Sequence, residues 1–273
     1  MVTLASTPIT PLFVPGSRPD RFAKAAASGA DAVILDLEDA VAPPSKADAR
    51  MAVAKHAESL GCPIIVRINA LETPWFEADV EMVRALPITV VMLPKTDGAN
   101  DLADLDRKLG RALLVIALIE TAAGLEHLSE ILAAPNVLCA AFGSIDFALD
   151  IGCAHERVSL LGARSEIVWR SRAARKPAPL DGVTSRVDSP LATHRDARHS
   201  ASLGFGGKLA IHPTQIEPIR KAFQPRSSVV DWAERVLAVS ASGEATRLDG
   251  EMVDGPVVER ARRILRWASR QRI

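Results

Sequence analysis

The sequence predicts a (β/α)8 TIM barrel of the α/β class, followed by a C-terminal helical extension. Eight short apolar runs recur along the chain, and most are separated by segments with apolar residues at three- and four-residue spacing. Apolar strands that alternate with amphipathic helices indicate a parallel sheet buried on both faces. The eight units fit within roughly 210 residues, which suits a barrel of typical length.

The expected strands and helices alternate from the N-terminus onward. The strands are Pro11–Pro15, Ala32–Asp39, Pro63–Ala70, Thr89–Lys95, Leu113–Thr121, Val137–Phe147, Pro179–Thr184 and Lys208–Pro213. The helices are Asp20–Ala27, Ser45–Ser59, Trp75–Leu86, Leu102–Leu109, Ala122–Leu132 and Glu166–Ala174. The alternative architecture, a doubly wound sheet, predicts a Gly-rich nucleotide-binding turn after an early strand. The segment PGSRPD lacks the GxGxxG pattern of that turn, which favours the barrel.

Two domains are expected, a catalytic barrel over residues 1–223 and a helical arm or lid over residues 224–273. Helices are expected at Pro218–Ala222, Val229–Ser240 and Val257–Ser269. The segment SGEATRLDGEMVDGPVV between the last two is rich in Gly and Asp and is expected to be a loop. A closed barrel does not require this extension, so we expect it to cover the site, to join subunits, or both.

The composition excludes several classes of function. The 33 basic and 33 acidic residues give a net charge of zero, so neither nucleic acid nor an anionic membrane is an expected partner. No apolar run is long enough to cross a bilayer, and the N-terminal residues lack a signal-peptide pattern. Cys62, Cys139 and Cys153 form no CxxC pair, which is typical of reduced thiols in a cytoplasmic protein.

Polar or ionisable residues end every expected strand after the first. They are Asp36, Glu38, Asp39, Arg67, Asn69, Lys95, Glu120, Asp146, Asp181 and His212. Catalytic groups of (β/α)8 barrels lie at the C-terminal ends of the strands. Buried charges are costly without partners, so a barrel with no site there would not need these residues. The sequence therefore predicts a functional site at this end of the barrel.

Glu120 and Asp146 end neighbouring expected strands on either side of one helix. Their carboxylates are expected to converge and to bind Mg²⁺, which usually takes one or two protein carboxylates. The alternative is that these acids cap the following helices or pair with Arg67 or Lys95. No His or Cys lies at ligand spacing from them, which argues against Zn²⁺.

Arg67 ends the third expected strand in the segment VRIN. Its guanidinium suits a bidentate grip on a substrate carboxylate, and the backbone N–H groups of Gly143 and Ser144 are expected beside the same anion. Asp36 and Glu38 share a strand face, where they would hold metal-bound water or orient Arg67. The alternative is that Arg67 only forms a buried structural ion pair with Asp36 or Glu38.

Two further features are expected to be structural. His212 precedes Pro213 in a tight turn, which favours a structural or backbone role over that of a general base. The Arg-rich segment Arg164–Lys176 is expected to be the solvated face of the sixth helix, with phosphate binding as the alternative.

Nine segments follow one another along the chain: LFVPGSRPDRFAKA, DAVILDLEDAV, VRIN, VMLPK, IETAAG, FGSIDF, PLDGV, GFGGKLAIHP and MVDGPVV. In this order they resemble the citrate lyase β-subunit-like family of CoA-ester lyases, which is grouped with the malyl-CoA and citramalyl-CoA lyases. The resemblance runs from about Leu12 to Val258. It implies a barrel with Mg²⁺ on Glu120 and Asp146, and it implies that Arg67 binds the carboxylate of a 2-oxo or hydroxy acid.

The resemblance also implies features that spacing does not reveal. Asp254, in the segment MVD, is expected to act as the acid/base in a neighbouring subunit's site, so a homotrimer or a higher homo-oligomer is expected. Arg18 and Lys24 fall in the segment that lies near the CoA phosphates in the family. One departure is Gly206, where the family often has an acidic residue.

The implied activity is Mg²⁺-dependent cleavage of a 3-hydroxy-3-carboxyacyl-CoA, of the citramalyl-, malyl- or citryl-CoA type, to acetyl-CoA and a 2-oxo acid. Arg67 and Asp254 would be the catalytic residues. The alternatives are a malyl-CoA-type thioesterase, a CoA-independent 2-oxo-acid aldolase, and a citrate lyase subunit that acts on an acyl-carrier protein. The motifs do not separate these activities.

Overall fold

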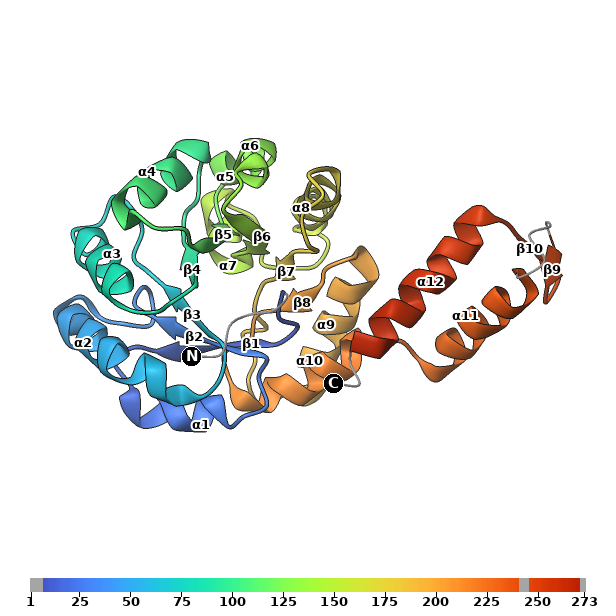
Figure 1. Ribbon diagram of the computed structural model, residues 1–273, viewed down its shortest axis with the longest axis horizontal. Coiled ribbons are helices and arrows are strands. Elements are labelled where there is room, and N and C mark those ends of the chain that lie inside the picture. Colours follow the sequence, from blue (N-terminus) through green and yellow to red (C-terminus); the bar gives the residue numbers. More distant parts are fainter. Residues whose placement is uncertain (1–6, 241–245, 271–273) are drawn as a thin grey trace. The chain divides into compact units, whose positions relative to one another are not determined.

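Eight parallel strands close into a barrel in the computed structural model, which describes residues 7–240 and 246–270 (Figure 1). The strands pair in chain order. Their bounds are β1 Pro11–Pro15, β2 Ala32–Asp36, β3 Ile64–Arg67, β4 Val90–Leu93, β5 Leu114–Ile119, β6 Val137–Phe142, β7 Leu180–Asp181 and β8 Gly207–Lys208. Backbone hydrogen bonds from Phe13 N to Ala210 O (2.8 Å) and from Ala210 N to Pro11 O (2.9 Å) close the ring. The predicted fold class is confirmed.

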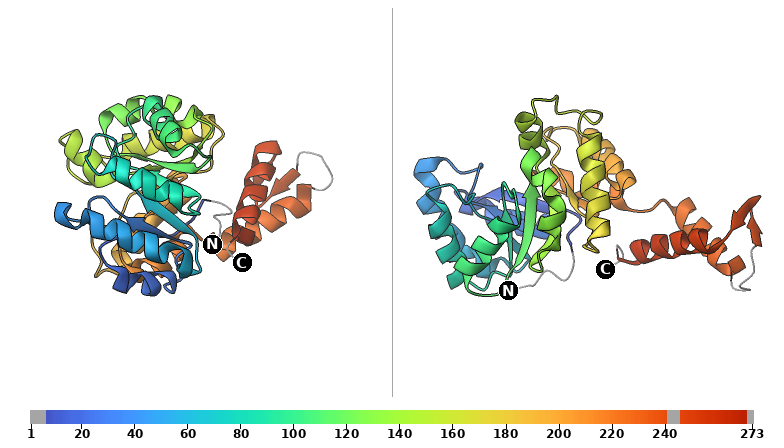
Figure 2. Two further views of the ribbon diagram at one scale, coloured as in Figure 1. Left: turned by 60° about the vertical axis from the view of Figure 1, so that its left-hand side comes forward. Right: turned by 90° about the horizontal axis from the view of Figure 1, so that it is seen from above.

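Helices surround the strands of the barrel, as two further views show (Figure 2). They are α1 Phe22–Ala26, α2 Lys46–His56, α3 Phe76–Ala85, α4 Ala99–Leu109, α5 Ala122–Glu126, α6 Leu128–Ala133, α7 Ser144–Asp150, α8 Leu161–Ala173, α9 Pro190–Leu203 and α10 Ile216–Phe223. Short 3-10 turns lie at Pro19–Arg21, Pro43–Ser45, Ala57–Leu60 and Pro213–Gln215. Alternate strand residues, such as Ile34, Ile65, Met92 and Ile116, are fully buried in one apolar cluster, so the barrel interior is a packed core.

Two helices of the barrel, α7 and α9, were not expected from the sequence, and the expected helix Ala122–Leu132 is divided into α5 and α6. The expected strand Val137–Phe147 ends at Phe142, and α7 begins at Ser144, so Asp146 lies in the first turn of a helix. Hydrophobicity alone cannot separate a buried strand from a buried helix that follows it directly. Helix α9 was not expected, because the residues that it buries are the small Thr193, Ala197 and Ser200 and leave no strong apolar pattern.

Lys221–Ile273 form a second compact unit, and Met1–Arg220 form the first. The second unit contains α11 Ser227–Ser240, β9 Thr246–Leu248, β10 Glu251–Val253 and α12 Gly255–Arg270. Its own apolar core is centred on Ala233, Val236, Val253 and Ala261. No helix in the described part of the chain is long and apolar enough to span a membrane.

The segment expected to be a loop in the second unit contains an antiparallel hairpin. Asp249 and Gly250 join its two strands, and both have positive φ angles, of 53° and 87°. An Asp-Gly pair between two short strands is a strong signal for such a two-residue turn, so the hairpin was predictable from the sequence. The expectation of a loop over this whole segment was wrong.

Candidate active site

A cavity of about 430 Å³ opens at the C-terminal ends of the barrel strands, and we call it the mouth cavity. Among the residues that line it are Asp36, Asp39, Arg67, Glu120, Gly143, Ser144 and Asp146. Glu38 joins this group through an ion pair with Arg67. The structure thus brings together eight side chains or backbone groups that the sequence singled out at strand ends or directly after them.

Arg67 is held by carboxylates on two sides. Its Nε and Nη2 donate to Asp36 at 2.8 and 2.6 Å, and its Nη1 lies 2.8 Å from Glu38 Oε2. Asp36 is opposite Arg67 in the parallel register of β2 and β3, which explains the pairing. The ion pair that the sequence left as an alternative therefore exists. A guanidinium has five N–H donors, so these contacts leave donors for a ligand in the mouth cavity.

Lys46 holds the backbone beside Glu38 in place, and it was not singled out from the sequence. Its buried Nζ donates to the backbone oxygens of Leu37 and Glu38 at 2.7 Å each and to Asn69 Oδ1 at 2.6 Å. It also lies 5.0 Å from the centre of the Trp75 ring. The ammonium thereby fixes the loop that presents Glu38. A Lys in the first turn of a helix is ordinarily exposed, so spacing offers no signal for this role.

Glu120 is held in place by backbone on two sides. Its Oε1 accepts a hydrogen bond from the backbone N–H of Lys95 at 2.7 Å. Lys95 has a φ of 46°, a left-handed conformation that is strained for a residue with a side chain. On the other side, a Cβ at Gly143 would lie 2.5 Å from Glu120 Cβ and Oε2. Only glycine at residue 143 leaves room for this carboxylate.

The mouth cavity has more carboxyl groups than basic groups. Arg67 is the one basic residue among the described residues that line it, against the acids Asp36, Asp39, Glu120 and Asp146. Burial raises the pKa of Glu120 to about 8, and Glu38 and Asp146 add to the effect. Burial also raises the pKa of Asp146, and it raises that of Glu38 to about 7 although Arg67 opposes it. Such carboxylates are stabilised by a cation.

The donor set fits Mg²⁺ better than a metal that requires a closed protein cage. In residues 7–240 and 246–270, no group of three or more His, Cys, Asp or Glu side chains is placed to hold a metal. Two carboxylates, Glu120 and Asp146, are nevertheless close enough for one to raise the pKa of the other. Mg²⁺ is commonly held by one or two carboxylates, with water and substrate at its other positions.

Ser144, the first residue of α7, forms part of the wall of the mouth cavity. Its buried Oγ lies 3.0 Å from His155 Nε2. A Cβ at Gly182 would come within 2.3 Å of that Oγ, so β7 must be followed by a glycine here. The Ser144 side chain is thus oriented by a neighbouring histidine that the sequence did not single out.

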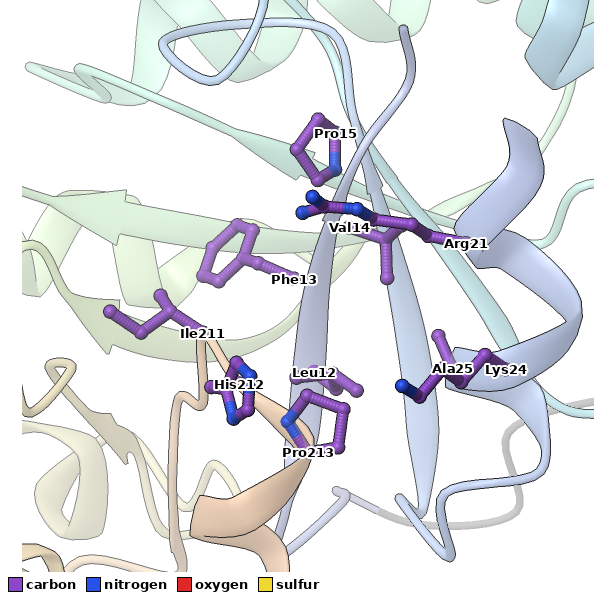
Figure 3. A pocket seen from close by; sticks show the side chains of 10 residues that line it. All are labelled: Leu12, Phe13, Val14, Pro15, Arg21, Lys24, Ala25, Ile211, His212 and Pro213. Atoms are coloured by element: carbon purple, nitrogen blue, oxygen red, sulfur yellow. The ribbon is translucent and has the colours of Figure 1, made fainter. Parts of the chain in front are cut away.

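A second cavity of about 270 Å³ lies beside β1, and we call it the β1 cavity (Figure 3). Arg21 and Lys24 approach it from one side of β1, and His212 approaches it from the other. Arg21 was not among the predicted residues. Predicted Arg18 does not line the cavity, and its guanidinium pairs with Asp20 at 2.7 Å in an exposed position. Arg18 and Lys24 therefore have different surroundings in the single chain.

Two other predicted residues, His212 and Asp254, lie outside the mouth cavity, although His212 lines the β1 cavity. His212 caps the turn that begins at Pro213, because its Nδ1 accepts a hydrogen bond from Thr214 N at 3.3 Å. This agrees with the structural role expected for it. Asp254 belongs to the second unit, where its exposed Oδ1 accepts a hydrogen bond from Val257 N at 3.2 Å at the start of α12.

The family model of the HpcH/HpaI aldolase/citrate lyase family matches residues 10–213 of this chain. The chain belongs to this family. A citrate lyase subunit beta-like protein of Mycobacterium tuberculosis is 38% identical, over 94% of both chains. The L-malyl-CoA/beta-methylmalyl-CoA lyase of Cereibacter sphaeroides is 33% identical, over 94% of this chain and 93% of that one.

The fold is also close to that of a solved member of the family. The crystal structure of CitE from M. tuberculosis in complex with magnesium, acetoacetate and coenzyme A superimposes with a TM-score of 0.86 at 37% identity, covering 97% of this chain and 99% of that one. Membership confirms the predicted family and the predicted class of enzyme, an oxo-acid lyase. It does not identify the substrate, because relatives with different names match about equally well.

Proposed function

We propose that the chain is a Mg²⁺-dependent carbon–carbon lyase that cleaves a 3-hydroxy-3-carboxyacyl-CoA to acetyl-CoA and a 2-oxo acid. The observation that carries this proposal is the charge pattern of the mouth cavity, where surplus buried carboxylates stand beside one guanidinium. Such a pattern suits a cation and a carboxylate bound together. The magnesium, acetoacetate and coenzyme A in the structure of the M. tuberculosis relative support it.

Glu120 and Asp146 would hold the Mg²⁺. The space at Gly143 and the hydrogen bond from Lys95 N keep one Glu120 oxygen fixed, which leaves the other for the ion. When bound, Mg²⁺ supplies Lewis-acid polarisation of the substrate hydroxyl oxygen. Asp36 and Glu38 would orient Arg67, since both contact its guanidinium.

Arg67 would bind the substrate carboxylate that becomes the carboxylate of the 2-oxo acid. The backbone N–H of Ser144 would face the same carboxylate at the start of α7. The N–H of Gly143, which was also expected beside this anion from the sequence, donates instead to Ile119 O at 2.9 Å. Ion pairing with Asp36 and Glu38 fixes the guanidinium plane before substrate arrives, which lowers the entropic cost of binding. The burial of Arg67 favours this role because charge-assisted hydrogen bonds strengthen away from water.

Asp254 would transfer the proton at carbon. In the cleavage direction the C3 hydroxyl gives its proton to solvent and its O–H electron pair forms the carbonyl of the 2-oxo acid, while the bond between the thioester's C2 and C3 breaks and its electron pair enters the enolate of acetyl-CoA. Asp254 then protonates that carbon, and in the reverse direction it removes the proton. We place this Asp254 on a neighbouring subunit of a homotrimer or higher homo-oligomer, with residues 224–273 as the contributing arm. Its exposure in the single chain supports this, because the carboxylate is free to enter another site.

The β1 cavity would receive the phosphates of CoA. Lys24 and the neighbouring Arg21 line it and offer positive charge, and Arg18 directly precedes the turn that ends at Arg21. We further propose a cytoplasmic location, which suits both a CoA thioester and the free Cys62, Cys139 and Cys153.

A panel of malyl-, citramalyl- and citryl-CoA tests the proposal when 2-oxo acid, acetyl-CoA and free CoASH are detected separately. We expect equal amounts of 2-oxo acid and acetyl-CoA, only with Mg²⁺ present, and no turnover by Asp254→Asn. Release of CoASH without acetyl-CoA would indicate the thioesterase. Cleavage of free hydroxy acids would indicate the aldolase, and activity only on acyl-carrier-protein thioesters would indicate a citrate lyase subunit.

A further inference from the structure

A third cavity, of about 230 Å³, lies between strands β7 and β8 and helices α8 and α9, and we call it the α8–α9 cavity. It is separate from the cavity that holds the proposed metal ligands. Its walls are strongly polar, and its charged or imidazole side chains include His155, Arg157, Arg164, Asp181, His199 and Lys208. None of them has a role in the proposed reaction.

The buried part of this wall has more positive than negative charge. Arg164, Asp181 and Lys208 are exposed by only 6%, 1% and 2%. Arg164 Nε lies 3.0 Å and Lys208 Nζ 3.4 Å from the same Asp181 carboxylate. Both cations, together with the hydroxyl of Ser200, outweigh burial and lower the pKa of Asp181, so it is ionised. One carboxylate therefore faces two buried cations, and one positive charge is left without a counter-charge.

The acids at the rim of the cavity do not supply that counter-charge. Asp196 accepts hydrogen bonds from Arg157 at 2.6 Å and from Thr184 at 3.1 Å, so it is already paired. Glu156 is exposed, and so is the basic Arg186 on the same rim. The surplus charge stays with Arg164 and Lys208.

Two donors of this wall also lack partners. Arg164 Nη1 and His199 Nε2 are buried and have no hydrogen-bond partner in the described part of the chain. Burial is the largest cause that lowers the pKa of His155 and of His199. Arg164 lowers both pKa values further, so the two imidazoles lie in a positive field. Buried charges and donors of this kind ordinarily have a partner.

We propose that the α8–α9 cavity binds a small oxyanion, a phosphate or a carboxylate group. Its volume of about 230 Å³ is several times the share of about 30 Å³ that one water molecule takes in the liquid, so a multi-atom ligand fits. An anion there neutralises the surplus charge of Arg164 and Lys208 and accepts hydrogen bonds from unpartnered donors. The hydrogen bond between His155 Nε2 and Ser144 Oγ joins the wall of this cavity to the wall of the mouth cavity.

Thermal unfolding of the full chain without Mg²⁺ tests the proposal, with inorganic phosphate and sodium acetate in separate titrations and NaCl at matched ionic strength. We expect a saturable rise in Tm with one or both oxyanions and no such rise with NaCl. A rise with phosphate alone would identify a phosphate site, and a rise with acetate alone a carboxylate site. An equal rise with NaCl would overturn the proposal.

The Lys208→Met variant tests whether the anion binds in the α8–α9 cavity. This substitution leaves Arg164 and Asp181 as a one-to-one pair, so the fold should be kept while the surplus charge disappears. We expect the Kd of the anion to rise about tenfold or more, which is the usual effect of losing one charged hydrogen-bond partner. An unchanged Kd in Lys208→Met would place the anion elsewhere and overturn the proposal.

His199→Gln gives a second, milder variant, because the lost Nε2 has no partner in the protein. It decides the question if Lys208→Met does not fold. We expect a weaker Kd for His199→Gln and an unchanged Kd for the matched control His194→Gln. His194 lies on the same helix, but its Nδ1 contacts Pro218 O at 3.1 Å and it does not line the cavity. Equal Kd values in these two variants would contradict the site.

Discussion

Arg67 is the residue on which the charge balance of the mouth cavity depends. We expect Arg67→Met to lower the free energy of unfolding by about 3–5 kcal/mol, because it leaves Asp36 and Glu38 buried without their cation. Urea unfolding followed by circular dichroism measures this change. The double variant Arg67→Met/Asp36→Asn should recover part of the loss.

The matched control for Arg67 is Arg84→Met, on the exposed face of α3. We expect it to change the free energy of unfolding by less than about 0.5 kcal/mol, as surface substitutions usually do. A similar loss of unfolding free energy in both variants would show that the ion pair between Arg67 and Asp36 contributes no more to stability than a surface residue does.

Glu120 makes Mg²⁺ binding dependent on pH. Without metal its folded pKa is about 8, above the ordinary value of 4.5. The folded chain therefore holds an extra proton between these values, and its stability should fall as pH rises through about 8. Mg²⁺ displaces that proton, so its affinity should rise with pH in the same window, by up to about tenfold per pH unit.

Titration calorimetry of Mg²⁺ at several pH values between 6 and about 8 checks this dependence. Glu120→Gln should bind Mg²⁺ weakly and should lose the part of the pH dependence that Glu120 causes. The control is Glu58→Gln, because Glu58 is exposed and lies outside the mouth cavity. An affinity of the unaltered chain that does not change with pH would exclude Glu120 as a ligand that must lose a proton.

At the scale of elements, the junction between β6 and α7 shapes the proposed metal site. We expect Gly143→Ala to weaken Mg²⁺ binding by about tenfold or more, because its Cβ would come within 2.5 Å of Glu120 and displace a ligand. The control is Gly162→Ala in α8, where a Cβ meets nothing within 4 Å and should slightly stabilise the helix. Calorimetric Mg²⁺ titrations of both variants would show the difference. Equal affinities would mean that Glu120 does not need the space.

This junction also shows how far the elements could be predicted from the sequence. The first six strands were predictable, because each is a buried apolar run between polar segments. The last two are only two residues long, Leu180–Asp181 and Gly207–Lys208, and the eighth shares only Lys208 with the expected strand Lys208–Pro213. The start of α7 and the whole of α9 were not, since one continues an apolar run and the other buries only small residues. The cluster of polar groups at the mouth followed from barrel topology.

Contacts between residues far apart in the sequence could not be predicted from the spacing of residues along the chain. The expectation of a solvated Arg164 was wrong, because Asp181 on the neighbouring strand pairs with it in the interior. The support of Glu38 by Lys46 likewise depends on where α2 lies against the barrel. Partners of buried charges become visible only when strands and helices are placed in space.

At the scale of the whole molecule, a net charge of zero conceals a separation of charge. The mouth cavity has surplus carboxylates, and the buried wall of the α8–α9 cavity has a surplus cation. Each surplus is buried, where a counter-ion is worth most. Binding of Mg²⁺ in one cavity and of an anion in the other would therefore each stabilise the folded chain, independently of the overall charge.

The sharing of Asp254 between subunits can be tested on the whole oligomer. If a site combines Glu120 of one chain with Asp254 of another, Glu120→Ala and Asp254→Asn protein are each inactive alone. Co-expressed in equal amounts, they should regain about a quarter of the active sites, since each site draws its two chains independently. Acetyl-CoA formation by the whole pool of oligomers, purified through one tag that both chains carry so that no assembly is selected, measures this recovery.

A matched control uses the double variant Glu120→Ala/Asp254→Asn, co-expressed with unaltered protein. Shared sites again leave about a quarter of the sites active, whereas sites built within one chain leave about half. The two mixtures thus give equal activity only when Asp254 crosses between subunits. If the first mixture is inactive and the second keeps about half of the activity, Asp254 serves its own chain, and residues 224–273 act as a lid within one subunit.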